Sequence, residues 1–293
     1  MKNLVICHGD GDGIISAAVI AKAIGSKATI VITQPFLLDK LVIDADVEKI
    51  YVVDISVNNK DISMTTGFVG AHSEKIVLWA DHHAGAEILA EILGEKLIFD
   101  ATEPSCPTLL AKSGYTVPEE WLNAANASDR PTDFPKTELS ERYNKAFKVS
   151  LIELQDGNRT SVEKIQRAFI EELASGTDSD LVSEYGNRYQ PIMDATKDAA
   201  EAFVELLPGV GIATLGEAKV DKTLLCTEGY KKFPVVAVQF KSVETGEPVT
   251  MVATSRKDLN LVQTFGLPSG APFRINLSGD FETVKKMIAE KLA

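Results

Sequence analysis

The stretch VICHGDGDGIISAA, residues 5–18, joins an apolar run to a loop of alternating polar residues and glycines, and then to a helical pattern. The run Leu4–Cys7 is aliphatic or β-branched and lacks polar alternation, which is typical of a strand buried on both faces. The segment Ile14–Ile24 is typical of a buried helix. A strand followed at once by a helix indicates a parallel α/β sheet. The stretch therefore predicts an α/β fold for this half of the chain.

Further short apolar runs repeat this arrangement along the first hundred residues. They alternate with helical patterns, of which Ala86–Leu93 is one. In a parallel sheet the functional residues lie beyond the carboxyl ends of the strands, so polar residues at those positions are the first candidates for a site. The further runs are Ala28–Thr33, Ile50–Val53, Ile76–Ala80 and Leu97–Phe99.

The pattern becomes helical after about Pro118. Apolar spacings predict helices as far as Leu207, and Pro208-Gly209 is expected to end the last of them. The segments that follow predict a smaller α+β domain. Its expected elements are strands at Val210–Leu215, Thr223–Cys226, Val235–Phe240 and Val249–Thr254, and helices at Lys257–Thr264 and Phe281–Leu292.

A chain of 293 residues is long enough for two domains of unequal size. We expect a parallel-sheet domain over residues 1–185, a helical connector over 186–207 and the smaller domain over 208–293. Hydrophobic residues make up 45% and charged residues 25%, which is typical of soluble globular proteins. No apolar run approaches a membrane span, and acidic residues follow the first run too early for a signal peptide. A cytoplasmic location without membrane partners is therefore expected.

The net charge and the cysteines exclude several classes of protein. A formal net charge of -12 argues against binding of long duplex nucleic acid, which relies on many Lys and Arg contacts to phosphates. Nucleotides and short oligonucleotides remain as partners. Cys7, Cys106 and Cys226 lie far apart without CxxC spacing, so they indicate neither a zinc site nor a disulfide framework. We expect reduced, mostly buried thiols.

Aspartate or histidine directly follows three of the predicted strands. A single acid at a strand end is usually a helix cap or a solvated residue, but many of them at one sheet edge should repel one another unless cations are bound. Oxygen-rich ligation with one or two imidazoles suits Mn²⁺ or Mg²⁺ better than structural zinc, which favours thiolates. The segments HGDGDG, VVDIS and ADHHAG supply His8, Asp10, Asp12, Asp54, Asp81, His82 and His83.

Two divalent ions require a fourth carboxylate for charge balance. Asp129, in the run AANASDRPTDF, is the favoured candidate. Asp100, which follows the LIF run, is its competitor, and Asp133 is a weaker one.

Other interpretations of HGDGDG fail in detail. The run does not contain GxGxxG, and its two aspartates would repel a dinucleotide. As an EF-hand loop it has Ile14 and Ala21 where oxygen ligands are required. The chain also lacks the GxxxxGK[ST] loop of nucleoside triphosphatases.

The three segments, in this order and spacing, resemble motifs I, II and III of the DHH phosphoesterases. This family includes nano-RNases, cyclic-dinucleotide phosphodiesterases, RecJ-type exonucleases and family II inorganic pyrophosphatases. The resemblance implies a DHH domain, a helical connector and a small DHH-associated C-terminal domain that carries substrate. His8 stands two residues before Asp10, whereas many members place this histidine four residues before. The short spacing resembles the oligoribonuclease-like branch.

The resemblance also implies a role for each residue. Asp10 and Asp12 would each bind one Mn²⁺, and Asp54 would bridge the two ions. His8 would complete the first site. His82 and Asp129 would complete the second. In the catalytic step, His83 would face the scissile phosphate and Asp81 would orient its neighbours.

The expected substrate-binding residues lie mainly in the C-terminal part. Family members commonly have a GGGH-type loop there, but the corresponding FGLPSGAPFRI, residues 265–275, contains no histidine. Ser255-Arg256 resembles the SR pair that precedes this loop, so Arg256 is expected to hold a phosphate as a bidentate donor. Arg274, Arg130 and Ser269 are weaker candidates.

These observations predict a metal-dependent phosphoesterase, or phosphoric ester hydrolase, that acts on nucleotides or short oligonucleotides. A hydroxide bridging two divalent ions, Mn²⁺ or alternatively Mg²⁺, is expected to attack phosphorus. One alternative is a pyrophosphatase or polyphosphatase. Another is a non-catalytic nucleotide-binding protein. A homodimer is left open.

Overall fold

The computed structural model describes residues 2–292 except 26–27, 59–60, 131–132, 156–159, 217–218, 242–245 and 268–272. Contacts divide the chain into two compact units. They consist of Met1–Phe147 with Thr160–Gly186, and of Lys148–Arg159 with Asn187–Ala293. Each unit has a five-stranded sheet and a hydrophobic core of its own.

The sheet of the first unit is entirely parallel, as the apolar runs predicted. Its strands stand in the order β2-β1-β3-β4-β5. Ile6, Val52 and Trp79 lie side by side in register across the middle of the sheet, and all three are fully buried. Burial of both faces explains why these strands lack polar alternation. The strands are β1 (Lys2–Cys7), β2 (Thr29–Ile32), β3 (Val47–Val53), β4 (Ile76–Asp81) and β5 (Leu97–Phe99).

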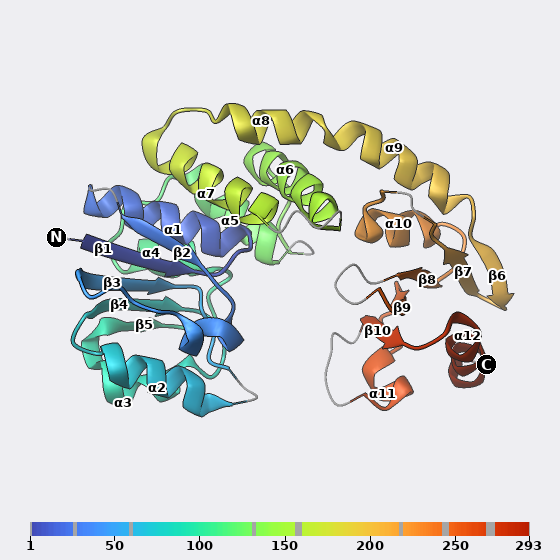
Figure 1. Ribbon diagram of the computed structural model, residues 1–293, viewed down its shortest axis with the longest axis horizontal. Helices are drawn as coiled ribbons and strands as arrows, with labels where there is room; N and C mark the ends of the chain where they lie inside the picture. The colour runs from blue at the N-terminus through green and yellow to red at the C-terminus, as the bar shows by residue number, and fades with distance from the viewer. Residues whose placement is uncertain are drawn as a thin grey trace. The chain divides into compact units, whose positions relative to one another are not determined.

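The helices of the first unit pack in two groups (Figure 1). The apolar helix α1 (Gly11–Ile24) contacts α4, α5 and α7, and its residues 11–20 are all buried. The other group consists of α2, α3 and the 3₁₀ helix η1. The bounds are α2 (Ile62–His72), α3 (Ala90–Leu93), α4 (Cys106–Lys112), α5 (Glu119–Asp129), α6 (Glu138–Gln155), α7 (Thr160–Ser175), α8 (Asp180–Asn187), η1 (Pro35–Lys40) and η2 (Ala86–Leu89).

The order of the strands reverses beside β1. From β1 the chain goes to β2 on one side, whereas β3, β4 and β5 follow on the other side. Open α/β sheets bind their ligands at such a reversal, beyond the carboxyl ends of the two central strands. The loops after β1 and β3 carry His8, Asp10 and Asp54, so the fold brings these residues to this edge of the sheet.

The second unit contains a mixed sheet in the order β10-β9-β8-β7-β6. Strands β7 and β8 are parallel, and the other neighbours are antiparallel. Among the described helices of both units, none combines the length and the apolar character that a membrane crossing requires. The elements are α9 (Tyr189–Ala200), β6 (Val204–Leu207), β7 (Val210–Thr214), α10 (Lys222–Gly229), β8 (Val235–Lys241), β9 (Pro248–Thr254), α11 (Leu261–Phe265), β10 (Arg274–Ser278) and α12 (Phe281–Leu292).

The prediction of helix up to Leu207 was wrong at its end. Helix α9 stops at Ala200, and β6 pairs with β7 as an antiparallel hairpin in which Leu207 faces Val210. Pro208-Gly209 forms the turn of this hairpin, and Gly209 has a φ of 78°, which glycine adopts without strain. The Pro-Gly pair therefore reverses a strand and does not end a helix.

Three further elements differ from the prediction in the second unit. Thr223–Cys226 lies inside α10 and not in a strand, because the Asp221 carboxylate accepts from the N–H groups of Thr223 and Leu224 and caps the helix. The helix expected at Lys257–Thr264 is shorter and begins only after the cap Asn260. Strand β10 was not predicted.

Candidate metal centre

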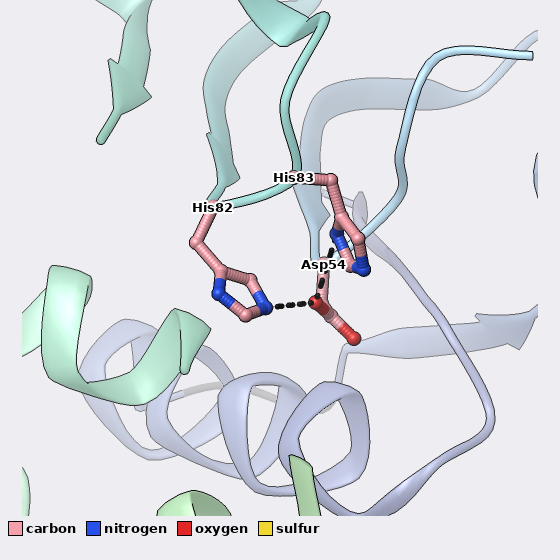
Figure 2. Close-up of side chains that lie close together, drawn as sticks. All are labelled: Asp54, His82 and His83. Atoms are coloured by element: carbon pink, nitrogen blue, oxygen red, sulfur yellow. Dashed lines mark ion pairs between the residues drawn. The ribbon is translucent and has the colours of Figure 1, made fainter. Parts of the chain in front are cut away.

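Three loops of the first unit bring acidic and imidazole side chains together at the carboxyl edge of its sheet. Figure 2 shows His82 and His83, which follow β4, turned toward Asp54, which follows β3. Within the described part of the chain, three groups of side chains place one ligand atom each within 4.8 Å of one another. The groups are His8–Asp10–Asp54, Asp12–His82–Asp129 and Asp54–His82–His83.

The first group is built around the loop after β1. Nδ1 of His8 lies 2.7 Å from Oδ2 of Asp10 and 3.9 Å from Oδ2 of Asp54. The other ring nitrogen, Nε2, lies 3.0 Å from Oε1 of Gln34. An N–H on Nε2 that donates to Gln34 leaves Nδ1 facing the two carboxylates. His8, Asp10 and Asp54 therefore offer one nitrogen and two carboxylates to a cation.

The second group joins α1, α5 and the end of β4. Nε2 of His82 lies 3.3 Å from Oδ2 of the buried Asp12, and Asp129, the last residue of α5, completes the group. Nδ1 of His82 lies 3.1 Å from the backbone carbonyl oxygen of Glu103. Because that carbonyl can only accept, it fixes the proton on Nδ1 and leaves Nε2 free as a ligand.

Asp54 belongs to the first group and, with His82 and His83, to the third, and its carboxylate oxygens are buried without a hydrogen bond. It is the only residue other than glycine with positive φ, 57°, among the described residues. Burial raises the pKa of Asp54 well above its usual range, and the charges of Asp12 and Asp10 add to the effect. A buried carboxylate without hydrogen bonds is costly, and two cations would satisfy both of its oxygens. This donor set fits a pair of divalent ions.

His83 differs from His82 in its partner and its exposure. Its Nδ1 lies 2.8 Å from Oδ1 of Asp81, and its backbone N–H donates to the same oxygen at 3.3 Å. The His83 side chain is 42% exposed, whereas that of His82 is 5% exposed. The hydrogen bond to Asp81 raises the pKa of His83, although burial opposes it. His83 can therefore meet a molecule that arrives from solvent.

The glycines of HGDGDG are required by close packing. A Cβ on Gly11 would lie 2.0 Å from Oγ of Ser128. A Cβ on Gly13 would lie 2.7 Å from the backbone oxygen of His8 and 2.8 Å from Oδ2 of Asp54. Only glycine lets helix α1 approach the carboxylates this closely.

The protonation of the cluster reflects crowded negative charge. Burial alone would lower the pKa of His8 and of His82, but the hydrogen bonds and charges of Asp10 and Asp12, respectively, raise both values to about 9. Burial would raise the pKa of Asp10, but His8 lowers it to about 2. Burial, followed by the charge of Asp10, raises the pKa of Asp12. In the absence of metal, protonated histidines therefore supply the compensating positive charge.

The two competitors of Asp129 take no part in these groups. Oδ1 of Asp100 accepts from the backbone N–H and the hydroxyl of Thr102, at 2.9 Å and 2.7 Å. Asp133 donates its backbone N–H to the carbonyl of Arg130, and its carboxylate belongs to none of the three groups. Asp129 alone among the three aspartates contributes to a group.

Three of the described residues predicted to bind substrate belong to the second unit, whereas the candidate ligands belong to the first. Ser255, Arg256 and Arg274 belong to the second unit. Arg256 lines a cavity of about 240 Å³ together with Lys291, and its guanidinium bonds both oxygens of Asp258. Arg274 is exposed at the start of β10. Ser255 donates its hydroxyl to the carbonyl of Pro234. Ser269 lies outside the described residues.

Sequence analysis missed several residues that hold the candidate ligands. Gln34 contacts His8, the Glu103 carbonyl contacts His82, and the backbone N–H of Cys106 donates to Asp12 at 3.2 Å. Arg130, predicted to bind substrate, donates Nη2 to the Glu103 carbonyl at 2.8 Å. Gln34 could have been suspected because it follows β2 at the same sheet edge. Backbone groups leave no signal in the residue types.

No family model and no curated protein matches the chain. Solved structures are similar over nearly its whole length. A pGpG-specific phosphodiesterase, PggH, from Vibrio cholerae has a TM-score of 0.68 at 16% identity, with 100% of this chain and 99% of that chain covered. An exopolyphosphatase-related protein from Bacteroides fragilis has a TM-score of 0.55 at 16% identity, with coverage of 99% and 91%.

A third similar structure is the exonuclease RecJ bound to manganese. Its TM-score is 0.52 at 14% identity, with 99% of this chain and 89% of that chain covered. All three proteins are DHH-superfamily members. This chain therefore has the fold of the DHH phosphoesterases.

Proposed function

We propose that this chain is a metal-dependent phosphoesterase that hydrolyses phosphoester bonds in nucleotides or short oligonucleotides. The observation that carries the proposal is the Asp54 carboxylate, which is buried without a hydrogen bond and is shared by two of the three groups of metal-type ligands. A buried acid with a raised pKa and no hydrogen bond is costly in a purely structural role. The fold and the manganese-bound RecJ neighbour support the same chemistry.

The ligand types favour Mn²⁺, with Mg²⁺ as the alternative. The three groups offer carboxylates and the imidazoles of His8, His82 and His83 but no thiolate, a set that suits hard or borderline divalent ions. Two such ions would supply Lewis-acid stabilisation of the phosphoryl oxygens and a nucleophile from water at neutral pH. His8, Asp10 and Asp54 would hold one ion. Asp12, His82, Asp129 and the other oxygen of Asp54 would hold the second.

His83 is proposed as the catalytic residue that meets the substrate. Asp81 holds Nδ1 of His83, so the ring presents Nε2 toward solvent. A proton on Nε2 can be donated to a non-bridging oxygen or to the leaving group of the phosphoester. Asp81, which is itself fully buried, fixes the ring orientation that this contact requires.

Substrate size is inferred from charge and from the second unit. A net charge of -12 disfavours long duplexes, whereas a short ligand needs only local cations. Arg256, beside Ser255, is proposed to hold a substrate phosphate, with exposed Arg274 as a weaker candidate. Three buried free thiols support a cytoplasmic location.

A pyrophosphatase or polyphosphatase remains the second candidate. The Bacteroides fragilis neighbour is described as exopolyphosphatase-related, and residues 265–275 lack the histidine of a GGGH-type loop. A non-catalytic nucleotide-binding protein is the third candidate. It would not need the exposed histidine oriented by Asp81.

A substrate screen with the full chain and Mn²⁺ separates these candidates. Linear dinucleotides, cyclic dinucleotides, 3′,5′-bisphosphonucleoside and pyrophosphate are offered, with Asp12→Asn as the inactive control. Release of mononucleotides or of phosphate from the nucleotide substrates supports the proposal. Turnover of pyrophosphate alone favours the second candidate. Nucleotide binding without turnover of any compound overturns the enzymatic proposal.

A further inference from the structure

The backbone carbonyl of Gly9 is held by two side chains from distant helices. The hydroxyl of Tyr143, on α6, donates to it at 3.2 Å, and Nε2 of Gln166, on α7, donates at 2.6 Å. Both hydrogen bonds are buried, and Tyr143 and Gln166 are 4% and 5% exposed. A Cβ on Gly9 would lie 2.5 Å from Nε2 of Gln166, so the Gln166 amide is in close contact with this residue.

Gly9 stands between two candidate ligands of one metal. His8 precedes it and Asp10 follows it, so the Gly9 carbonyl lies in the backbone that connects the two side chains, within the peptide that joins Gly9 to Asp10. A carbonyl with two lone pairs that receives two donors has little freedom to rotate. Tyr143 and Gln166 therefore fix the arrangement of His8 and Asp10, although neither side chain belongs to a candidate ligand group.

A different carbonyl orients the histidine of the other group. The oxygen of Glu103 accepts from Nδ1 of His82 at 3.1 Å and from Nη2 of Arg130 at 2.8 Å. Arg130 directly follows Asp129 at the end of α5. The Arg130 guanidinium thus ties the loop that orients His82 to the helix that carries Asp129.

We propose that separate positioning residues control the two metal sites: Tyr143 and Gln166 control the site of His8 and Asp10, and Arg130 controls the site of Asp12, His82 and Asp129. This inference rests on the proposed function, because it presupposes that both sites bind divalent ions. It gives Arg130 a role in metal binding in place of the substrate contact expected from sequence. Loss of such indirect partners typically weakens metal affinity by about 10–100-fold.

Single-site backgrounds of the full chain allow each site to be measured alone. Asp12→Asn impairs the second site and leaves the first, whereas Asp10→Asn impairs the first and leaves the second. Calorimetric titration of the metal-free protein with Mn²⁺ then reports one dissociation constant in each background. The positioning variants are Gln166→Met, Tyr143→Phe and Arg130→Met, and Tyr143→Phe removes only one oxygen atom.

In the Asp12→Asn background, Gln166→Met and Tyr143→Phe are expected to raise the dissociation constant by about 10–100-fold, while Arg130→Met leaves it unchanged. In the Asp10→Asn background, Arg130→Met should raise the dissociation constant by about 10–100-fold, whereas Gln166→Met and Tyr143→Phe should leave it unchanged. The direction of the Arg130 effect is decisive. Removing a positive charge near a cation site would tighten Mn²⁺ binding by electrostatics alone, so weaker binding points to the lost contact with the Glu103 carbonyl.

Two controls test for effects of general destabilisation or charge. Ile165→Val shortens a fully buried side chain beside Gln166, and it should leave both dissociation constants unchanged. Lys112→Met removes a cation that bonds the carboxylate of Glu103 but not its carbonyl, so it should not weaken the second site.

Equal weakening of both sites by any positioning variant, or no change in either, would overturn the inference. Tighter Mn²⁺ binding by Arg130→Met would overturn the part of the inference that concerns Arg130. If the unmodified chain binds no Mn²⁺, the proposed function itself fails. This result differs from the two outcomes that would overturn only the roles of the positioning residues.

Discussion

Nε2 of His82 lies 3.6 Å from Oδ1 of Asp54, although the two residues follow different strands (Figure 2). This separation is too long for a hydrogen bond, and neither atom has a hydrogen-bond partner among the described residues. Nitrogen and oxygen ligands of one cation, each about 2.0–2.2 Å from it, can be separated by this distance. The pair is therefore arranged to share a metal ion more readily than to bond each other.

Asp54→Asn should separate stability from metal binding. The amide keeps the size of the carboxylate and tolerates positive φ. It replaces a buried carboxyl group whose pKa is raised by burial and by the charges of Asp12 and Asp10. Without metal, the variant should be more stable than the unmodified chain by about 1–2 kcal/mol. With Mn²⁺, it should lose the stabilisation that ligand binding confers. Urea unfolding with and without Mn²⁺ measures both effects.

Asp100→Asn is the matched control for this comparison. Asp100 is half-buried, and its carboxylate bonds local groups of Thr102 at the surface. The control should show the full stabilisation by Mn²⁺. A metal-free Asp54→Asn protein that is less stable than the unmodified chain would argue that Asp54 has an ordinary structural role.

Asp129→Asn should weaken Mn²⁺ binding, whereas Asp100→Asn and Asp133→Asn should not. Only Asp129 lies with Asp12 and His82 in a group of potential ligands. Loss of one charged ligand from the second site should lower the number of tightly bound ions from about two per chain to about one. Metal analysis by mass spectrometry after desalting counts them. Retention of two ions by Asp129→Asn would return Asp100 to consideration.

Gly13→Ala should disrupt the metal centre, and Gly67→Ala should not. The new methyl group on Gly13 would meet the His8 carbonyl and the Asp54 carboxylate below 3.0 Å, so one of them must move. A methyl group on Gly67, in α2, would meet no atom within 4 Å, and alanine there should raise helix stability by about 0.5–1 kcal/mol. Thermal melting and Mn²⁺ titration of both variants test this. Equal Mn²⁺ affinity in both variants would contradict the packing argument.

The parallel sheet could be predicted because its strands are continuous apolar runs, and their carboxyl ends define one edge. The second unit was harder to predict. The hairpin at Pro208-Gly209 and the helix at Lys222–Gly229 depend on a turn and on the cap Asp221, whose local signals were outweighed by apolar patterns. Local sequence therefore predicted buried strands better than short elements near turns.

Most of the candidate ligands could be suspected because they lie in or just after the loops that follow buried strands; Asp12, in the first turn of α1, and Asp129, at the end of α5, are brought to them by the packing of helices. The partners of these ligands could not be predicted. The Gly9 and Glu103 carbonyls are backbone groups, and Tyr143 and Gln166 lie 134 and 157 residues from Gly9. Such contacts arise only when the helices pack on the sheet, so residue type and spacing do not reveal them.

His83→Ala should separate turnover from metal binding. Its imidazole is held by Asp81 and is more exposed than that of His82, which places it toward substrate. The variant should retain about two Mn²⁺ ions per chain and their stabilisation, while turnover falls by about 10²–10⁴-fold. Asp54→Ala is the contrasting variant and should lose metal. If His83→Ala loses its ions, the assignment of His83 to the substrate is wrong.

Mn²⁺ affinity and metal-free stability should depend on pH in opposite directions. His8 and His82 have pKa values of about 9 in the metal-free fold, above the ordinary value of 6.5. Their contribution to stability is therefore complete below about pH 6.5 and is lost as the pH rises through 9. A cation must displace a proton from each histidine, so affinity at each site should rise by about tenfold per pH unit between pH 6.5 and 9. Calorimetry in two buffers of different ionisation enthalpy counts the released protons, and urea unfolding of the metal-free chain follows stability. Affinity that is independent of pH, without proton release, would show that these histidines are not ligands.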